Sequence, residues 1–150
     1  MPDMNNTFPT EENLSGLNRK DFQKDIDDKQ TDLFILRNKK GMEVAVTNYG
    51  CAILSIMVPD KNGKYANVIL GHDSIDHVIN SPEPFLSTTI GRYGNRIAKG
   101  KFTLYAEEHS LTINNGPNSL HGGPIGFHAR VWDADQIDES TIIFNYVSAD

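Results

Sequence analysis

Short apolar stretches separated by turn residues dominate the chain from about residue 31 onward. Residues 33–36 are four consecutive apolar residues. Within 42–47, Met42, Val44 and Val46 alternate with Glu43, Ala45 and Thr47. Within 52–58, every second residue is apolar and shares one face of a strand: Ala52, Leu54, Ile56 and Val58. Turn-forming residues separate these stretches, at 38–41 (NKKG) and 59–63 (PDKNG). A two-residue period broken by such turns predicts antiparallel β-strands.

The second half of the chain shows the same short period. We expect two hairpins there, with strands at 102–104 and 111–113, and at 131–137 and 141–147. Smaller elements are expected at 67–70 (a short strand) and within 73–80 (one helical turn). Because a helical period is almost absent elsewhere, the pattern predicts an all-β fold, an antiparallel β-sandwich.

The first thirty residues differ from the rest. Residues 1–14 are polar, contain two prolines and have no apolar period, which favours a loosely attached arm. Asn18 is a suitable N-cap for a short helix. We therefore expect residues 1–30 to form a polar N-terminal arm with a short helix, and residues 31–150 to form the sandwich domain.

Composition excludes several classes of partner. The 150 residues carry a net charge of −6 and no basic stripe, so we expect no nucleic-acid partner. No apolar run approaches the roughly 18 residues of a membrane span, and no signal peptide is evident. Cys51 is the only cysteine, which fits a reducing compartment and a small buried side chain better than a reactive thiol. We expect a cytoplasmic protein.

Isolated histidines give no sign of a metal centre. His72 and His77 lie beside aspartates in a polar turn, without the further His or Cys ligands that a metal site needs. We interpret them, together with His109 and His128, as solvated polar side chains. Residues 94–101 superficially resemble a phosphate-binding loop, but their glycine spacing and the phenylalanine after the lysine do not fit that motif. No metal and no other cofactor are expected.

Two glycine-rich loops carry the most distinctive polar side chains, at 91–97 (GRYGNRI) and 114–123 (NNGPNSLHGG). Asn95 and Arg96 lie in the first loop and His121 in the second. Arginine offers planar paired donors, and histidine can donate or accept near neutral pH. We predict that both loops meet in one concave patch that binds a small molecule covered in hydroxyl groups. From the residues alone, a purely structural role in bracing the loops is equally open.

Residues 91–102 and 114–123, with Gly126 and Phe127, strongly resemble the aldose 1-epimerase (galactose mutarotase) family. Shorter matches support this likeness, at 48–50, 58–60, 68–71 and 130–132. The resemblance runs from about Thr31 to Asp150. It implies the N-terminal part only of a galactose-mutarotase-like supersandwich. It also implies that Asn95, Arg96 and His121 bind the substrate, while Arg92 and Asn118 shape their loops.

The resemblance further implies an isomerase of carbohydrate metabolism, which interconverts the α and β anomers of aldohexoses such as galactose and glucose. One group takes the C1 hydroxyl proton while another protonates the ring oxygen, with no cofactor. The family's acid histidine and base glutamate come from a later part of a longer chain. We therefore expect no catalytic residue before Asp150, and a nearly inactive chain.

The expected partner is a small-molecule aldohexose, and the full-length parent is expected to be a monomer. Two other hypotheses remain. The chain is a non-catalytic carbohydrate-binding β-sandwich module, or it is part of a split protein that a second chain completes.

Overall fold

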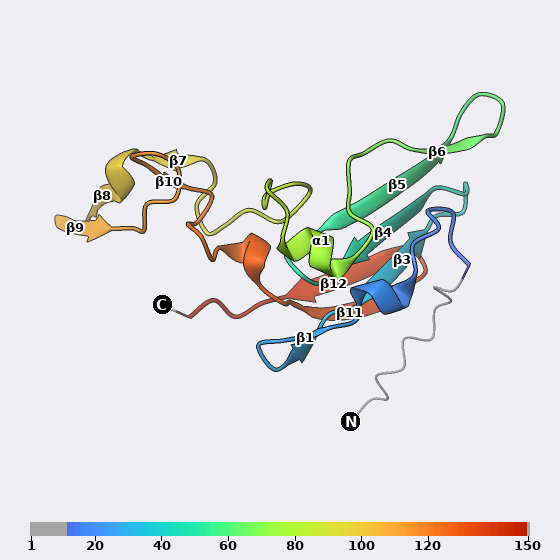
Figure 1. Ribbon diagram of the computed structural model, residues 1–150, viewed down its shortest axis with the longest axis horizontal. Coiled ribbons are helices and arrows are strands. Elements are labelled where there is room, and N and C mark those ends of the chain that lie inside the picture. Colours follow the sequence, from blue (N-terminus) through green and yellow to red (C-terminus); the bar gives the residue numbers. More distant parts are fainter. Residues whose placement is uncertain (1–11, 150) are drawn as a thin grey trace.

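The computed structural model describes residues 12–149, and its largest unit is a four-stranded antiparallel sheet (Figure 1). The strands pair in chain order: β3 (Leu33–Arg37), β4 (Glu43–Thr47), β5 (Ile53–Pro59) and β6 (Tyr65–Asn67). The first three confirm the strands predicted from the alternating pattern. The prediction of a strand at 67–70 was wrong, because the Asn67 side chain accepts hydrogen bonds from the Ile56 and Ile69 amides and so ends β6.

A β-bulge changes which side chains of β5 face the core. Leu54 is the extra residue in the pairing of β5 with β4. Leu54 and Ser55 are both buried, with 2% and 3% of their surfaces exposed, so the alternation reverses at this point. Met57 consequently takes the buried position, and Ile56 is only half-buried. The prediction that Ala52, Leu54, Ile56 and Val58 share one face of the strand was therefore wrong beyond Leu54.

A second hairpin lies against β3 and supplies a second layer (Figure 1). It consists of β11 (Asp133–Asp138) and β12 (Thr141–Asn145), which confirms the predicted hairpin with its turn near residue 139. The Phe144 ring meets the Phe34 ring edge-on at 6.2 Å, and Gln136 Nε2 donates to the Ile35 carbonyl at 3.0 Å. This layering of antiparallel sheets confirms the all-β class.

Residues 12–30 pack onto the sheet with Phe22 as their fully buried side chain. They contain the 3₁₀ turn η1 (Arg19–Phe22) and the small hairpin β1 (Asp25–Ile26) with β2 (Lys29–Gln30). Asn18 caps η1, as predicted, by accepting from the Lys20 amide at 3.1 Å. Phe22 is fully buried against helix α1 (Ile75–Ile79). The arm predicted at 1–14 falls mostly outside the described residues.

The core lies between the sheet, α1 and η1. It consists of apolar side chains from all three, together with the loop before β5: Phe22, Leu33, Ile35, Ala45, Ala52, Leu54, Ile75 and Val78. Burial of such side chains contributes roughly 1.5–3 kcal/mol for each large one. The helical turn predicted within 73–80 is confirmed, with Ser74 as its N-cap.

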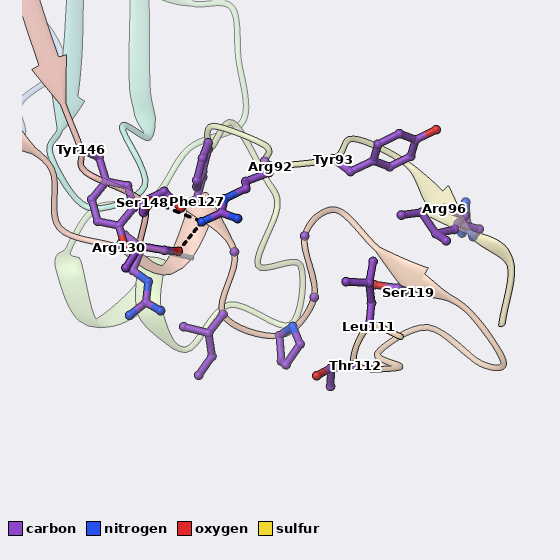
Figure 2. A pocket seen from close by; sticks show the side chains of 18 of the residues that line it. Arg92, Tyr93, Arg96, Leu111, Thr112, Ser119, Phe127, Arg130, Tyr146 and Ser148 are labelled. Carbon is purple, nitrogen blue, oxygen red and sulfur yellow. Dashed lines mark hydrogen bonds between the residues drawn. The ribbon is translucent and has the colours of Figure 1, made fainter. Parts of the chain in front are cut away.

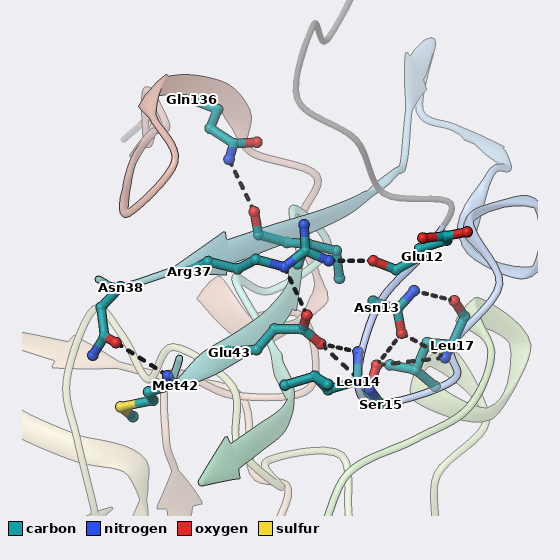
Figure 3. Close-up of polar contacts among 11 residues, drawn as sticks. Glu12, Asn13, Leu14, Ser15, Leu17, Arg37, Asn38, Met42, Glu43 and Gln136 are labelled. Carbon is teal, nitrogen blue, oxygen red and sulfur yellow. Dashed lines mark hydrogen bonds and ion pairs between the residues drawn. The ribbon is translucent and has the colours of Figure 1, made fainter. Parts of the chain in front are cut away.

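A buried carboxylate ties residues 12–15 to the edge of this core (Figure 3). The Glu43 side chain is fully buried and accepts from Arg37 Nε at 2.9 Å. Its other oxygen accepts from the Leu14 and Ser15 amides at 2.7 and 3.3 Å. Arg37 also donates to the Glu12 carbonyl. Buried charges persist only when they are paired and hydrogen-bonded in this way.

The remaining elements are β7 (Arg96–Ile97), η2 (Ala98–Gly100), β8 (Lys101–Leu104), β9 (Glu107–Ser110), β10 (Ser119–Leu120) and η3 (Phe127–Ala129). Most of them, β7 to β10 with η2, form a separate end of the molecule, whereas η3 lies next to the main body (Figure 1). The prediction for the hairpin here was partly wrong: its second strand is β9, and not 111–113. Tyr105 and Ala106 take positive φ values of 49° and 66°, which makes a tight two-residue turn possible.

Candidate functional site

A short antiparallel ribbon brings the two glycine-rich loops together. In the β7–β10 pair, Arg96 lies opposite Leu120 and Ile97 lies opposite Ser119. The ladder continues one step further, where the His121 amide donates to the Asn95 carbonyl at 3.0 Å. Residues that are 26 positions apart in the chain are therefore neighbours in space, as the hypothesis of one patch requires.

Asn95 and His121 are joined a second time through the imidazole. The Asn95 backbone N–H donates to His121 Nδ1 at 2.9 Å. Both residues have left-handed backbone conformations, with φ values of 66° and 54°. Such conformations are uncommon outside glycine, although Asn and His tolerate them better than most residues. They cluster at functional sites, where the surrounding structure compensates for their strain.

Arg96 completes the group of three residues. Its Nε donates to Asn115 Oδ1 at 2.9 Å, and one terminal nitrogen donates to Asn95 Oδ1 at 3.4 Å. Asn115 belongs to the second loop, so the guanidinium bridges both loops while its side chain stays exposed. The structure thus brings Asn95, Arg96 and His121 together. Arg96 contacts both loops through the side chains of Asn115 and Asn95.

A cavity of about 940 Å³ opens beside this group. Figure 2 shows its two walls, with Phe127, Arg130 and Tyr146 on one side and Arg96 and Ser119 on the other. Of the three candidate residues Asn95, Arg96 and His121, called the triad below, only Arg96 lines the cavity. The triad therefore lies at the rim of the cavity. Among the described residues that line it are three arginines and no Asp or Glu. The cavity is therefore locally cationic in a chain whose net charge is −6.

Arg92 and Asn118 hold backbone segments in place. Arg92 Nε donates to Ser148 Oγ at 2.9 Å, and its terminal nitrogen donates to the Ser148 and Ala149 carbonyls. Asn118 Oδ1 accepts from the Lys99 amide at 3.3 Å. These contacts agree with the loop-shaping roles that the family resemblance implies for both residues.

Gly122 and Gly123 differ in a way that permits a matched test. Both have φ near 90°, at +88° and +85°. A Cβ on Gly122 would lie 1.9 Å from the Gly91 carbonyl oxygen, whereas a Cβ on Gly123 would meet nothing within 4 Å. The two loops therefore touch backbone to backbone at Gly122, and of these two glycines only Gly122 is required by the contact.

We expect Gly122→Ala to displace the Gly91 carbonyl and to lower the free energy of unfolding by about 1–3 kcal/mol more than Gly123→Ala. Both variants carry the cost of a left-handed alanine, so their difference isolates the clash. Urea denaturation followed by Trp132 fluorescence measures both. Equal losses in the two variants would contradict the close packing of the loops.

The interpretation of His128 as a solvated side chain was wrong. Only 5% of its surface is exposed, because η3 turns it inward against the ring of Phe85. Phe85 also contacts His121, with ring centroids 4.8 Å apart, and lies 4.5 Å from His128. Burial, followed by the nearby charge of His121, lowers the pKa of His128. A lone histidine and phenylalanine in turns gave no sequence signal for this stack.

The other titratable side chains behave closer to expectation. His77 Nδ1 contacts Asp73 Oδ1 at 2.5 Å on the surface, and this partner lowers the pKa of Asp73. Cys51 is half-buried, and burial raises the pKa of its thiol to about 12, so it is unreactive near neutral pH. Within residues 12–149, no group of three or more His, Cys, Asp or Glu side chains is arranged to hold a metal ion. No helix in the same range is long and apolar enough to cross a membrane.

Comparison with known proteins identifies the family to which this site belongs. The profile described as aldose 1-epimerase matches residues 32–150. The chain belongs to the aldose 1-epimerase family. It is 39% identical to galactose mutarotase from Bos taurus over 109 residues, and 36% identical to aldose 1-epimerase from Escherichia coli (strain K12) over 118 residues. These alignments cover 73% and 79% of this chain, but 31% and 34% of the relatives.

Solved structures of the aldose 1-epimerase family share this fold. A GalM/aldose epimerase homologue from C. elegans superimposes with a TM-score of 0.72 at 31% identity, over 76% of this chain and 35% of the homologue. Galactose 1-epimerase from Lactobacillus acidophilus NCFM gives 0.66 at 32% identity, over 78% and 33%. The fold of this chain therefore matches part of the galactose epimerase fold. The chain spans about a third of the length of the curated relatives that it matches.

Proposed function

We propose that this chain is the sugar-binding part of an aldose 1-epimerase, in which Asn95, Arg96 and His121 hold an aldohexose. The double connection between Asn95 and His121, directly beside Arg96, is the observation that carries the proposal. Two loops from distant parts of the chain are fixed there by main-chain contacts. Their exposed side-chain groups can then meet a ligand without rearrangement, which reduces the entropy cost of binding.

Polar groups at the rim and apolar surfaces in the cavity suit a sugar. Arginine and histidine donors match the oxygens of vicinal hydroxyls, and the rings of Phe127 and Tyr146 in the cavity wall offer apolar faces. Relatives named galactose mutarotase make galactose the first sugar to test, with glucose as the second. We propose an aldohexose as the partner, with the cytoplasm as the compartment and a monomeric parent.

Ring opening in mutarotation needs one group that takes the proton of the C1 hydroxyl and another that gives a proton to the ring oxygen. Each such group typically supplies a factor of roughly 10² to 10⁴ in rate. No carboxylate lines the cavity among the described residues, and the family resemblance assigns the acid histidine and base glutamate to a later part of a longer chain. We therefore propose that the 150-residue chain binds the sugar but mutarotates it at close to the buffer rate.

Titration with D-galactose and polarimetry on α-D-galactose test the two parts of this proposal. We expect saturable binding of galactose, and a mutarotation rate near that of buffer. Saturable binding with rapid mutarotation would contradict the proposal that both proton-transfer groups come from a later part of a longer chain. Absence of binding to either galactose or glucose would contradict the sugar-binding role itself.

The non-catalytic carbohydrate-binding module remains the second candidate. Both candidates predict that this chain binds galactose. They differ in the full-length parent protein, because a binding module gives no mutarotation even at full length. Polarimetry on a full-length parent therefore distinguishes the two functions.

A further inference from the structure

The hydrogen bond between Asn95 and His121 fixes the position of the proton on the imidazole. A backbone N–H can only donate, so His121 Nδ1 must offer a lone pair at 2.9 Å from the Asn95 nitrogen. A hydrogen on Nδ1 would face the hydrogen of the Asn95 amide. The ring consequently carries its hydrogen on Nε2, the nitrogen that the Asn95 amide does not contact.

Two further rings hold the imidazole in this orientation. Phe85 meets it at an interplanar angle of 62°, and His128 supports Phe85 from its own side at 61°. His128 is buried, and its Nδ1 has no hydrogen-bond partner among the described residues. Burial lowers the pKa of His128, and the unpaired Nδ1 adds no stabilisation of a charge, so the uncharged form is favoured. The Phe85–His128 stack, in which the rings meet edge-on, is therefore a neutral support for the His121 ring.

The neighbouring polar groups also present donors. Arg96 has no acceptor atom, and its Nε is already engaged by Asn115. Asn95 Oδ1 is turned toward Arg96, which leaves the NH₂ group of the Asn95 side chain as its remaining polar end. The side-chain polar groups of the three residues that these contacts leave unused are then N–H groups.

We propose that the Asn95 backbone amide and the Phe85–His128 stack lock His121 as the neutral Nε2–H tautomer, so that His121 donates to the bound aldohexose and does not take a proton from it. This inference rests on the proposed sugar-binding function. Phe85 and His128 act as positioning residues, because they reach the ligand only through His121. The face of the sugar that meets the triad presents oxygen lone pairs, and the hydrogens of its hydroxyl groups find acceptors elsewhere.

Long-range ¹H–¹⁵N correlation NMR of the ¹⁵N-labelled 150-residue chain near neutral pH tests the lock without any sugar. We expect the His121 ring to show hydrogen on Nε2 and none on Nδ1. His121→Phe identifies the resonances by their loss. A hydrogen on Nδ1, or on both nitrogens, would overturn the proposal while leaving galactose binding free to stand.

Phe85→Leu and Phe85→Tyr separate positioning from a general structural role. We expect the leucine variant to show a mixture of His121 tautomers, and the tyrosine variant, which retains an aromatic ring, to keep the single tautomer. A purely structural role would lower stability in Phe85→Leu without altering the tautomer, and that result would overturn the role of the stack. The wild-type measurement stands even if Phe85→Leu fails to fold.

Addition of D-galactose tests the donor role. We expect the His121 Nε2 resonance to shift as the sugar saturates the chain. If galactose binds, as shown by other resonances, and Nε2 does not respond, the donor role is overturned and the proposed function stands. If no resonance of the chain responds to galactose, the proposed function fails, and the donor role fails with it.

Discussion

Arg96→Ala is expected to weaken the binding of D-galactose by about ten- to a hundredfold. Hydrogen bonds to a charged group contribute roughly 1.5–3 kcal/mol, which corresponds to this range of affinity. Arg96 lines the cavity, its guanidinium has N–H groups beyond those that bind Asn115 and Asn95, and its loss also releases both asparagines. Isothermal titration calorimetry or an NMR titration of the wild type and the variant measures the change.

Arg92→Ala provides the matched control for Arg96→Ala. Arg92 lies in the same loop and is also exposed, but it donates to the backbone and hydroxyl of residues 148–149. We expect galactose affinity to change by less than about threefold in this variant, because Arg92 lines the same cavity but its guanidinium already binds residues 148–149. Equal losses in the two variants would show that the cavity responds to its general charge and not to Arg96.

Arg37→Met is expected to lower the free energy of unfolding by about 3–5 kcal/mol, because it leaves the fully buried Glu43 carboxylate without its cation (Figure 3). The converse change, Glu43→Gln, is expected to cost only about 1–2 kcal/mol. Arg37 is a third exposed and can reach water, and a glutamine oxygen can still accept from the Leu14 amide. Urea denaturation followed by the fluorescence of Trp132 measures both variants.

Lys101→Met tests the same chemistry on the surface. Lys101 pairs with Glu108 at 2.7 Å, but both side chains are more than half exposed. Such pairs contribute at most about 1 kcal/mol, so this variant is expected to remain near wild-type stability. If Arg37→Met proves no more damaging than Lys101→Met, the buried carboxylate does not anchor residues 12–15 to the sheet.

The strands that depend on local signals were predictable from the sequence. β3, β4 and the hairpin of β11 and β12 follow from a two-residue period and from turns rich in Asn, Gly and Asp. The bulge at Leu54 was not predictable, because it depends on how two strands pair. Burial of Glu43 was hidden for a similar reason, since a glutamate in an alternating strand normally marks the solvent face.

The candidate site was likewise predictable in part. Glycine, asparagine, arginine and histidine marked the two loops, and the family resemblance assigned roles to Asn95, Arg96 and His121. The β7–β10 ribbon that joins the loops is only two residues long in each strand, too short to leave a periodic signal. Phe85 and His128 were missed because their role arises only when three separate turns pack together.

A galactose titration followed residue by residue in ¹H–¹⁵N NMR spectra tests the central claim, that Asn95, Arg96 and His121 form one sugar-binding patch, most directly. The account predicts that the largest shifts fall on the amides of these three residues and on the Arg96 side chain, with a single shared dissociation constant. Saturable shifts confined to another region, such as the β11–β12 hairpin, with the three residues unmoved, would contradict it.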